Sequence, residues 1–205
     1  MTSVEDVQSL ISSILLRSLQ SRHRKAAEVQ ALIDVIKYEA HETLKDGRSV
    51  IVRAVRPDDK STILRGIGLF SDASLYKRFH GAKTSLTERE LKYLTEIDYL
   101  HHVALLAVPK DDDQAIGGGR FIESDEALPP RSAEMSFAVG DNFQGIGVGT
   151  IILKHLIYLA REIGVKILEA DVLSENTAMI RVFEKSGLPV TKIDEDRNIH
   201  VTMTL

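Results

Sequence analysis

The segment that most constrains the fold is glycine-rich: residues 143–150 read Phe-Gln-Gly-Ile-Gly-Val-Gly-Thr. Residues 134–139 before it have the pattern of a strand, and a long apolar helix is expected to begin near Thr150. Glycine lets backbone amides point at one centre, and the N-terminal end of a helix adds positive potential there. The segment therefore predicts a phosphate-binding loop between a strand and a helix.

The spacing of these glycines argues against a dinucleotide-binding turn. Such a turn has Gly-x-Gly-x-x-Gly directly after its strand, whereas Gly145, Gly147 and Gly149 alternate here. Residues 140–144 also separate the glycines from the strand. A flexible strand-to-helix turn without a ligand is the remaining alternative to a phosphate loop.

Composition restricts the class of protein and its partners. The 205 residues are 43% hydrophobic and 27% charged, as in a soluble globular chain with one core and an appendage. A net charge of −4 argues against a nucleic-acid partner. With no cysteine, the chain has no disulfide, thiolate metal site or cysteine nucleophile. The acidic N-terminus is unlike a secretory signal and no apolar run has membrane-spanning length, so we expect a cytoplasmic protein without a membrane partner.

Residues 1–46 are expected to form an N-terminal helical extension. Apolar side chains recur at helical spacing in two stretches between residues 3 and 45. Each stripe must be buried on the rest of the chain or on a second copy. A homodimer through these helices is therefore one expectation, and packing within one chain is the other.

Residues 47–205 are expected to form the main domain. The predicted strands are 49–55, 102–108, 116–122, 134–139, 166–173, 190–193 and 198–205. The predicted helices begin at Asp58 and near Thr150 and cover 72–80, 87–94 and 177–186. Thr87 and Glu90 have the spacing of a capping box.

Two groups of polar residues resemble metal ligands, but neither predicts a site. The acidic residues 111–113 lack the further oxygen ligands of a calcium loop. His101 and His102 are adjacent in a strand, so their side chains would face opposite sides. We expect no metal.

Two separate segments resemble the GNAT superfamily of acyl-CoA-dependent N-acetyltransferases. Read from Gln144, the glycine segment is Gln-x-x-Gly-x-Gly, similar to the pyrophosphate loop of that family. The segment from Asn176 to Leu188 is similar to the family's Asn-x-x-Ala/Met stretch that ends in Lys-x-Gly-hydrophobic. The resemblance covers residues 49–205. It implies a mixed α/β GNAT fold, with a central, mostly antiparallel twisted sheet that is splayed at the acetyl-CoA site and flanked by helices.

A narrower likeness lies upstream. Residues 74–79 and 91–98, ahead of 102–105, resemble the GNAT domain of bacterial protein lysine acetyltransferases. This implies a protein lysine side chain as the acceptor, with a small-molecule amine as the alternative. In relatives of that group a cyclic-nucleotide-binding domain precedes the GNAT domain, but residues 1–46 predict only helices, so control by a cyclic nucleotide is not implied.

The resemblance implies direct attack of an amine on acetyl-CoA, the co-substrate, in a ternary complex. Glu134 matches the position of a general-base glutamate, and an exposed carboxylate at a strand end is the alternative. Asn176 would contact the cofactor or cap the helix at Thr177. Many relatives have tyrosine at the position of Phe183 to protonate the leaving thiolate. Phenylalanine has no such proton, so no general acid is assigned. The cofactor-binding residues implied are Phe137, Ala138, Val139, Gln144, Gly145, Ile146, Gly147, Val148, Gly149, Thr150, Asn176, Met179 and Phe183.

Two functions of other classes stay open. A non-catalytic acyl-CoA sensor would bind the cofactor without turnover and signal through the N-terminal helices. A nucleotide-binding oxidoreductase would use Glu169 or Asp171, about 20 residues after Gly149, to bind a ribose. Too few residues follow the glycine loop for the fold of such an oxidoreductase.

Overall fold

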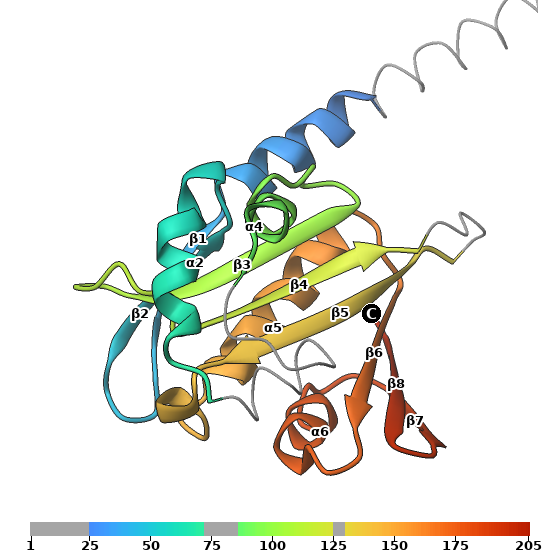
Figure 1. Cartoon of the computed structure of the whole chain (residues 1–205). Coiled ribbons are helices and arrows are strands. Elements are labelled where there is room, and N and C mark those ends of the chain that lie inside the picture. Colours follow the sequence, from blue (N-terminus) through green and yellow to red (C-terminus); the bar gives the residue numbers. More distant parts are fainter. Residues whose placement is uncertain (1–24, 72–85, 125–129) are drawn as a thin grey trace, which may run out of the picture.

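Eight strands form one sheet in the computed structural model, which describes residues 25–71, 86–124 and 130–205 (Figure 1). The strand order is β1-β2-β3-β4-β5-β6-β8-β7, and every neighbouring pair is antiparallel except β5 and β6. The strands are β1 Glu39–Thr43, β2 Ser49–Ala54, β3 His102–Pro109, β4 Gly117–Glu123, β5 Ser132–Val139, β6 Ile167–Leu173, β7 Val190–Glu195 and β8 Asn198–Thr204. The predicted mixed α/β class and mostly antiparallel sheet are confirmed.

Helices cover both faces of the sheet (Figure 1). Helix α5 lies on one face, and α2 and α4 lie on the other. Besides the helical residues 25–36, the helices are α2 Lys60–Ile67, α4 Glu88–Thr95, α5 Val148–Glu162 and α6 Thr177–Glu184, with 3-10 turns at Pro57–Asp59 and Asp141–Phe143. The capping box before α4 is confirmed, since the Thr87 N–H donates to Glu90 Oε2 at 2.8 Å and Thr87 Oγ1 accepts from the Glu90 N–H.

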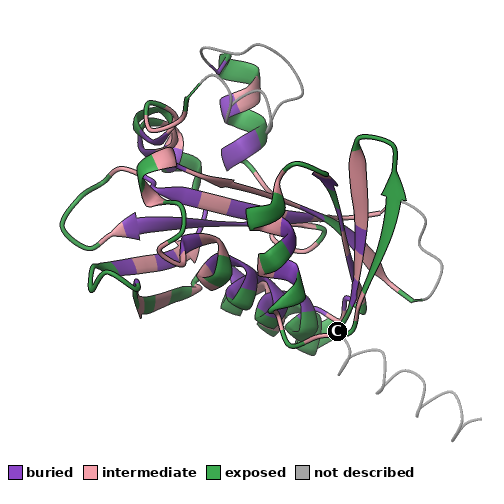
Figure 2. Cartoon of the chain, turned by 90° about the horizontal axis from the view of Figure 1, so that it is seen from below, coloured by how far each residue is buried: buried purple, intermediate pink, exposed green. Residues whose placement is uncertain are grey.

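The core has one layer on each face of the sheet. Val103 and Leu105 of β3 pack in the cluster that contains the inner side of α5, whereas Ala104 and Leu106 pack toward Ile63 of α2. Figure 2 shows buried residues along the strands and on the side of α5 that faces them. Because side chains alternate along a strand, a central strand between two layers is apolar throughout. This explains the unbroken apolar run of β3.

The chain N-terminal to β2 differs from the helical expectation. Residues 25–36 are helical as predicted, but Glu39–Thr43 form strand β1, which pairs with β2. The prediction of helix up to residue 45 is therefore wrong for this stretch. As an edge strand whose residues are exposed or half-buried, β1 has no apolar alternation to reveal it. The sheet thus begins before the expected boundary at residue 46, and the helices predicted within residues 3–24 and 72–80 lie outside the described residues.

A chain of polar contacts holds β1 and the residue before it on α5. His155 is buried; its Nε2 lies 2.9 Å from Glu42 Oε1, and its Nδ1 lies 2.6 Å from the Tyr38 hydroxyl oxygen. Burial raises the pKa of Tyr38 to about 12 and lowers the pKa of His155. The imidazole is therefore neutral near pH 7, where one ring nitrogen can donate to Glu42 and the other can accept from the tyrosine.

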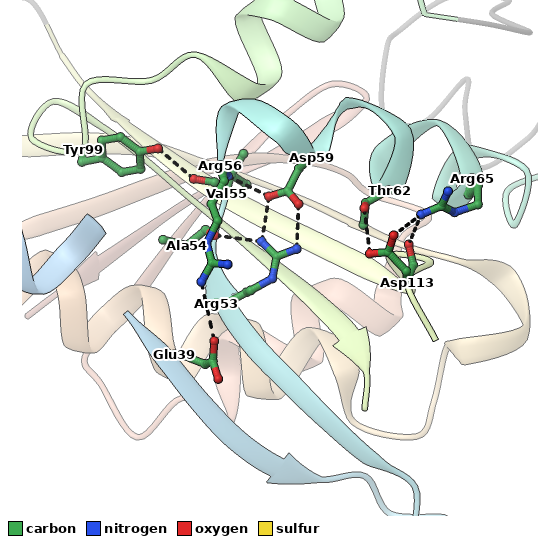
Figure 3. Close-up of polar contacts among 10 residues, drawn as sticks. All are labelled: Glu39, Arg53, Ala54, Val55, Arg56, Asp59, Thr62, Arg65, Tyr99 and Asp113. Atoms are coloured by element: carbon green, nitrogen blue, oxygen red, sulfur yellow. Dashed lines mark hydrogen bonds and ion pairs between the residues drawn. The ribbon is translucent and has the colours of Figure 1, made fainter. Parts of the chain in front are cut away.

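Helix α2 is fixed over the opposite face by two ion pairs (Figure 3). Arg53 of β2 donates two hydrogen bonds to the Asp59 carboxylate, at 2.6 and 2.7 Å, and both side chains are largely buried. At the other end of the helix, Arg65 pairs with Asp113 at 2.5 Å, and the Thr62 hydroxyl donates to the same carboxylate. These contacts hold both ends of α2 against the sheet.

The Arg53–Asp59 pair provides a test of this fold. Asp59→Ala leaves a buried guanidinium without its carboxylate, so we expect the free energy of unfolding to fall by about 3 kcal/mol. Urea unfolding followed by circular dichroism measures the change. Glu184→Ala breaks the exposed pair with Lys192 and is the control, for which a much smaller change is expected. Equal losses in the two variants would contradict the role given to the buried pair.

Candidate active site

A large groove opens where β5 and β6 separate. Parallel pairing between these strands ends at Glu134 and Glu169. On its other side β5 stays paired with β4 as far as Val139 and Gly117. Among the described strands, residues 135–139 therefore have a neighbour on one side only, and a groove of about 780 Å³ runs along them. An extended ligand can hydrogen-bond to such an unpaired edge as an added strand would.

The glycine loop forms one end of this groove. Gly145 and Gly147 have φ angles of +76° and +105°, which side chains other than glycine rarely adopt. Gly147 is the N-cap residue of α5, which begins at Val148, two residues before the predicted start near Thr150. Among the described residues, the N–H groups of residues 145–150 have no protein acceptor. Unpaired amides at the N-terminus of a 15-residue helix form an anion site.

The turn between β1 and β2 packs on this loop. The Lys45 N–H donates to the Ile146 carbonyl at 3.0 Å, and the Arg48 guanidinium lies 4.7 Å from the centre of the Phe143 ring. The Lys45 side chain runs beside Gly147 and lines the groove. Lys45 was not predicted from the sequence, because residues 45–48 are a polar stretch with the character of a linker and are distant from the loop in sequence.

Helix α6 supplies the opposite wall. Asn176 caps the helix, since its Oδ1 accepts from the Met179 N–H at 3.3 Å, and it also lines the groove. Arg181 and Lys185, one helical turn apart, line the groove as well. Neither residue was predicted from the sequence, although their i, i+4 spacing places both on one face of the helix that Asn176 begins. Together with Lys45 they bring positive charge to a groove in a chain whose net charge is negative.

The structure brings most of the predicted site residues together. Twelve of them line the groove: Glu134, Phe137, Ala138, Val139, Gln144, Gly145, Gly147, Val148, Gly149, Thr150, Asn176 and Met179. Ile146 instead packs against the core, and Phe183 is buried behind Phe137, with ring centroids 5.8 Å apart. The side chains of Ile146 and Phe183 therefore face the core and do not line the groove, whereas the backbone N–H of Ile146 still belongs to the glycine loop.

Glu134 lies at the closed end of the groove and is exposed. Its neighbours Ala133 and Met135 are buried against the α5 side, so Glu134 and Ser136 face the α2 and α4 side. The carboxylate therefore lies on the sheet face opposite α5, where a second reactant can approach while an extended ligand occupies the edge of β5.

The cation Arg120 lies on the same face of the sheet, on the neighbouring strand β4. Arg120 Nη1 donates to His102 Nε2 at 3.1 Å, and the guanidinium lies 5.6 Å from the Tyr93 ring centre. Burial and the nearby guanidinium lower the pKa of His102 to about 4, so this imidazole is neutral at pH 7 and accepts the bond. Arg120 pairs with Ser136 across β4 and β5, so positive charge lies two residues along β5 from Glu134.

The described residues contain no group of three or more His, Cys, Asp or Glu side chains arranged to hold a metal ion. In the same residues, no helix combines the length and apolar character needed to cross a membrane.

Residues 73–188 match the family described as "Acetyltransferase (GNAT) family". The chain belongs to this family. Its domain is thus that of an acyl-CoA-dependent N-acetyltransferase, and acetyl-CoA is the co-substrate of the family. The fold and the paired sequence segments of the GNAT family, predicted from the sequence, are confirmed.

Similar proteins include bacterial acetyltransferases. The chain is 33% identical to "Acetyltransferase Pat" of Mycolicibacterium smegmatis over 144 residues, 70% of this chain and 42% of Pat. It is 29% identical to "Acetyltransferase PA5475" of Pseudomonas aeruginosa over 140 residues, 67% of this chain and 74% of that protein. The crystal structure of the GNAT domain of S. lividans PAT aligns with a TM-score of 0.75 at 30% identity, covering 82% of this chain and 97% of that one. The chain thus spans less than half the length of Pat.

Gly149 tests the anion site without straining the backbone. A Cβ added there would make an ordinary contact, 3.8 Å from Val139 Cγ2. Gly149→Val should retain the fold and place methyl groups over the loop amides. We expect acetyl-CoA affinity to fall on the order of tenfold to a hundredfold, the loss for one or two hydrogen bonds to a charged group.

Calorimetry measures this affinity, and Gly149→Ala is the graded control, with a smaller loss. Unchanged affinity in Gly149→Val would show that the loop does not contact the phosphates.

Proposed function

We propose that this chain transfers an acetyl group from acetyl-CoA to the side-chain amine of a protein lysine, with Glu134 as the general base. The observation that carries the proposal is the position of Glu134, exposed at the end of the groove where β5 leaves β6. The amine attacks directly in a ternary complex, in agreement with a sequence that has no cysteine to be acylated.

Acetyl-CoA would lie along the groove from the loop to Glu134. The amides of residues 145–150 bind the pyrophosphate, and Lys45, Arg181 and Lys185 offer cations to the phosphates. The pantetheine follows residues 137–139 and takes up the unpaired edge of β5. The thioester then lies next to Glu134 and within reach of strand amides that can polarise its carbonyl.

The chemistry requires removal of a proton from the acceptor. A lysine amine has a pKa near 10.4, so on the order of one in a thousand is neutral at pH 7. Glu134 takes the proton, directly or through a water, as the nitrogen attacks the thioester carbon. The new C–N bond forms, the C–S bond breaks, and the CoA thiolate takes a proton from solvent. Phe183 has no acidic proton and is buried, so it has no part in this last step.

The similarity to proteins named Pat and PAT supports a protein lysine as the acceptor. A small-molecule amine is the alternative. Mass spectrometry of a deacetylated bacterial proteome incubated with the purified chain and acetyl-CoA separates them. New acetyl-lysines above a no-enzyme control support the protein acceptor, whereas CoA release only with small amines would reject it.

The role of Glu134 predicts a separation of binding from chemistry. Glu134→Gln should lower kcat by about a hundredfold to ten-thousandfold, the usual contribution of a general base, and leave acetyl-CoA affinity nearly unchanged. The deficit should shrink as pH rises, because more of the amine is then neutral without a base. Thiol release measured from pH 7 to 10 gives both quantities.

Glu169→Gln is the matched control, since Glu169 pairs with Glu134 across β5 and β6, and we expect near wild-type turnover from it. Full activity of Glu134→Gln at pH 7 together with a large loss in Glu169→Gln would move the base to β6. Acetyl-CoA binding without turnover in the wild-type chain would favour the sensor.

We also propose that the N-terminal helix pairs with a second copy of the chain. Val29, Ile33 and Ile36 form an exposed apolar stripe at 53%, 37% and 41% relative exposure, while Val35 faces the core. An exposed stripe of this kind is typical of a helix that packs on a partner.

Ile33→Lys should therefore convert a dimer to a monomer in sedimentation experiments. Ala27→Lys, on another side of the helix, should leave the dimer intact. A wild-type chain that sediments as a monomer would overturn the proposal.

A further inference from the structure

A second cavity, of about 100 Å³, lies on the α2 and α4 side of the sheet. Its floor is formed by strands β3, β4 and β5, and its roof by α2, with Leu94 of α4 beside it. Most of the lining is apolar, and Arg120 and Ser136 supply the polar part among the described residues. It is therefore a pocket suited to hydrocarbon.

The cavity lies between small residues in the sheet and helix α2 above them. Ala104, Gly118 and Ala138 lie in the floor, where larger side chains would fill the space. The ion pairs of Arg53 with Asp59 and of Arg65 with Asp113 hold both ends of α2 (Figure 3). An apolar cavity costs stability, so one retained beside the groove is a candidate binding site for an apolar group.

The cavity adjoins the acetyl-CoA groove, because the two share part of their lining. Phe70, Ser136 and Ala138 line both. Ser136 lies beside Glu134, where the thioester would lie, and Ala138 belongs to the part of β5 that the pantetheine would follow. A group that extends from the thioester carbonyl toward the α2 face would therefore enter this cavity.

We propose that the cavity is an acyl-chain pocket, and that the chain accepts acyl groups longer than acetyl. This inference rests on the proposed function, and the transfer step is the same, with the hydrocarbon tail taking no part in bond formation. A cavity of about 150 Å³ holds benzene in another protein. The volume of about 100 Å³ thus corresponds to roughly four carbon atoms, enough for propionyl and butyryl chains.

The aliphatic stem of an acceptor lysine is the competing occupant, since Glu134 faces the same side of the sheet. The two occupants differ in the binary complex. An acyl-chain pocket changes the affinity of acyl-CoA when no acceptor is present, whereas a lysine channel does not.

The test is calorimetry of acetyl-, propionyl- and butyryl-CoA with the wild-type chain and no acceptor. Each added methylene should raise affinity about fourfold, the gain from burying one such group. Ala104→Val narrows the floor and should remove this rise between acetyl and butyryl. Leu106→Ala widens it and should extend the rise to hexanoyl-CoA. Circular dichroism checks that each variant folds. If Ala104→Val does not fold, the affinities of the three thioesters for the wild-type chain and for Leu106→Ala decide between the two occupants.

Equal affinities for the three thioesters in the wild-type chain would overturn the acyl-chain pocket while leaving the proposed function intact. No binding of any thioester would contradict the proposed function itself. The kinetic counterpart is the ratio of kcat/KM for propionyl-CoA to that for acetyl-CoA. Ala104→Val should lower this ratio about tenfold. An equal fall in kcat/KM for propionyl-CoA and for acetyl-CoA would instead assign the cavity to the acceptor.

Discussion

The active site depends on the separation of β5 from β6 beyond Glu134 and Glu169. If these strands stayed paired, the polar edge of β5 would be satisfied by β6, and the 780 Å³ groove would not exist. Because they separate, one stretch of β5 offers hydrogen bonds on one side and alternating side chains on both faces. The same five residues can then hold a cofactor, present Glu134 nearby and border the apolar cavity under α2.

The sequence predicted those parts of the fold that depend on a few neighbouring residues, such as the glycine loop and the start of helix α4. Gly145 and Gly147 need positive φ, so the loop could be located from composition and position alone. The capping box of Thr87 and Glu90 marked the start of α4, and the stripe after the loop identified α5. The order of strands after residue 49 followed from apolar runs with turns between them.

Features that depend on long-range packing could not be predicted in this way. Strand β1 is an edge strand with little apolar alternation, and its pairing and its contacts with α5 appear only in three dimensions. Lys45 reaches the loop because its hairpin packs there. The resemblance placed Phe183 at the cofactor, but the rotation of α6 turns it toward the core and leaves Arg181 and Lys185 facing the groove. No local pattern in β6 indicates where its pairing with β5 ends.

Amide hydrogen exchange in the presence of acetyl-CoA tests the central claim, that the cofactor occupies the opening between β5 and β6. Bound acetyl-CoA should slow exchange in residues 135–139 and 145–150 together, because both segments carry amides that it would pair. Exchange in β8, which is paired on both sides, should change little. Saturating acetyl-CoA that leaves both segments unchanged would contradict the account.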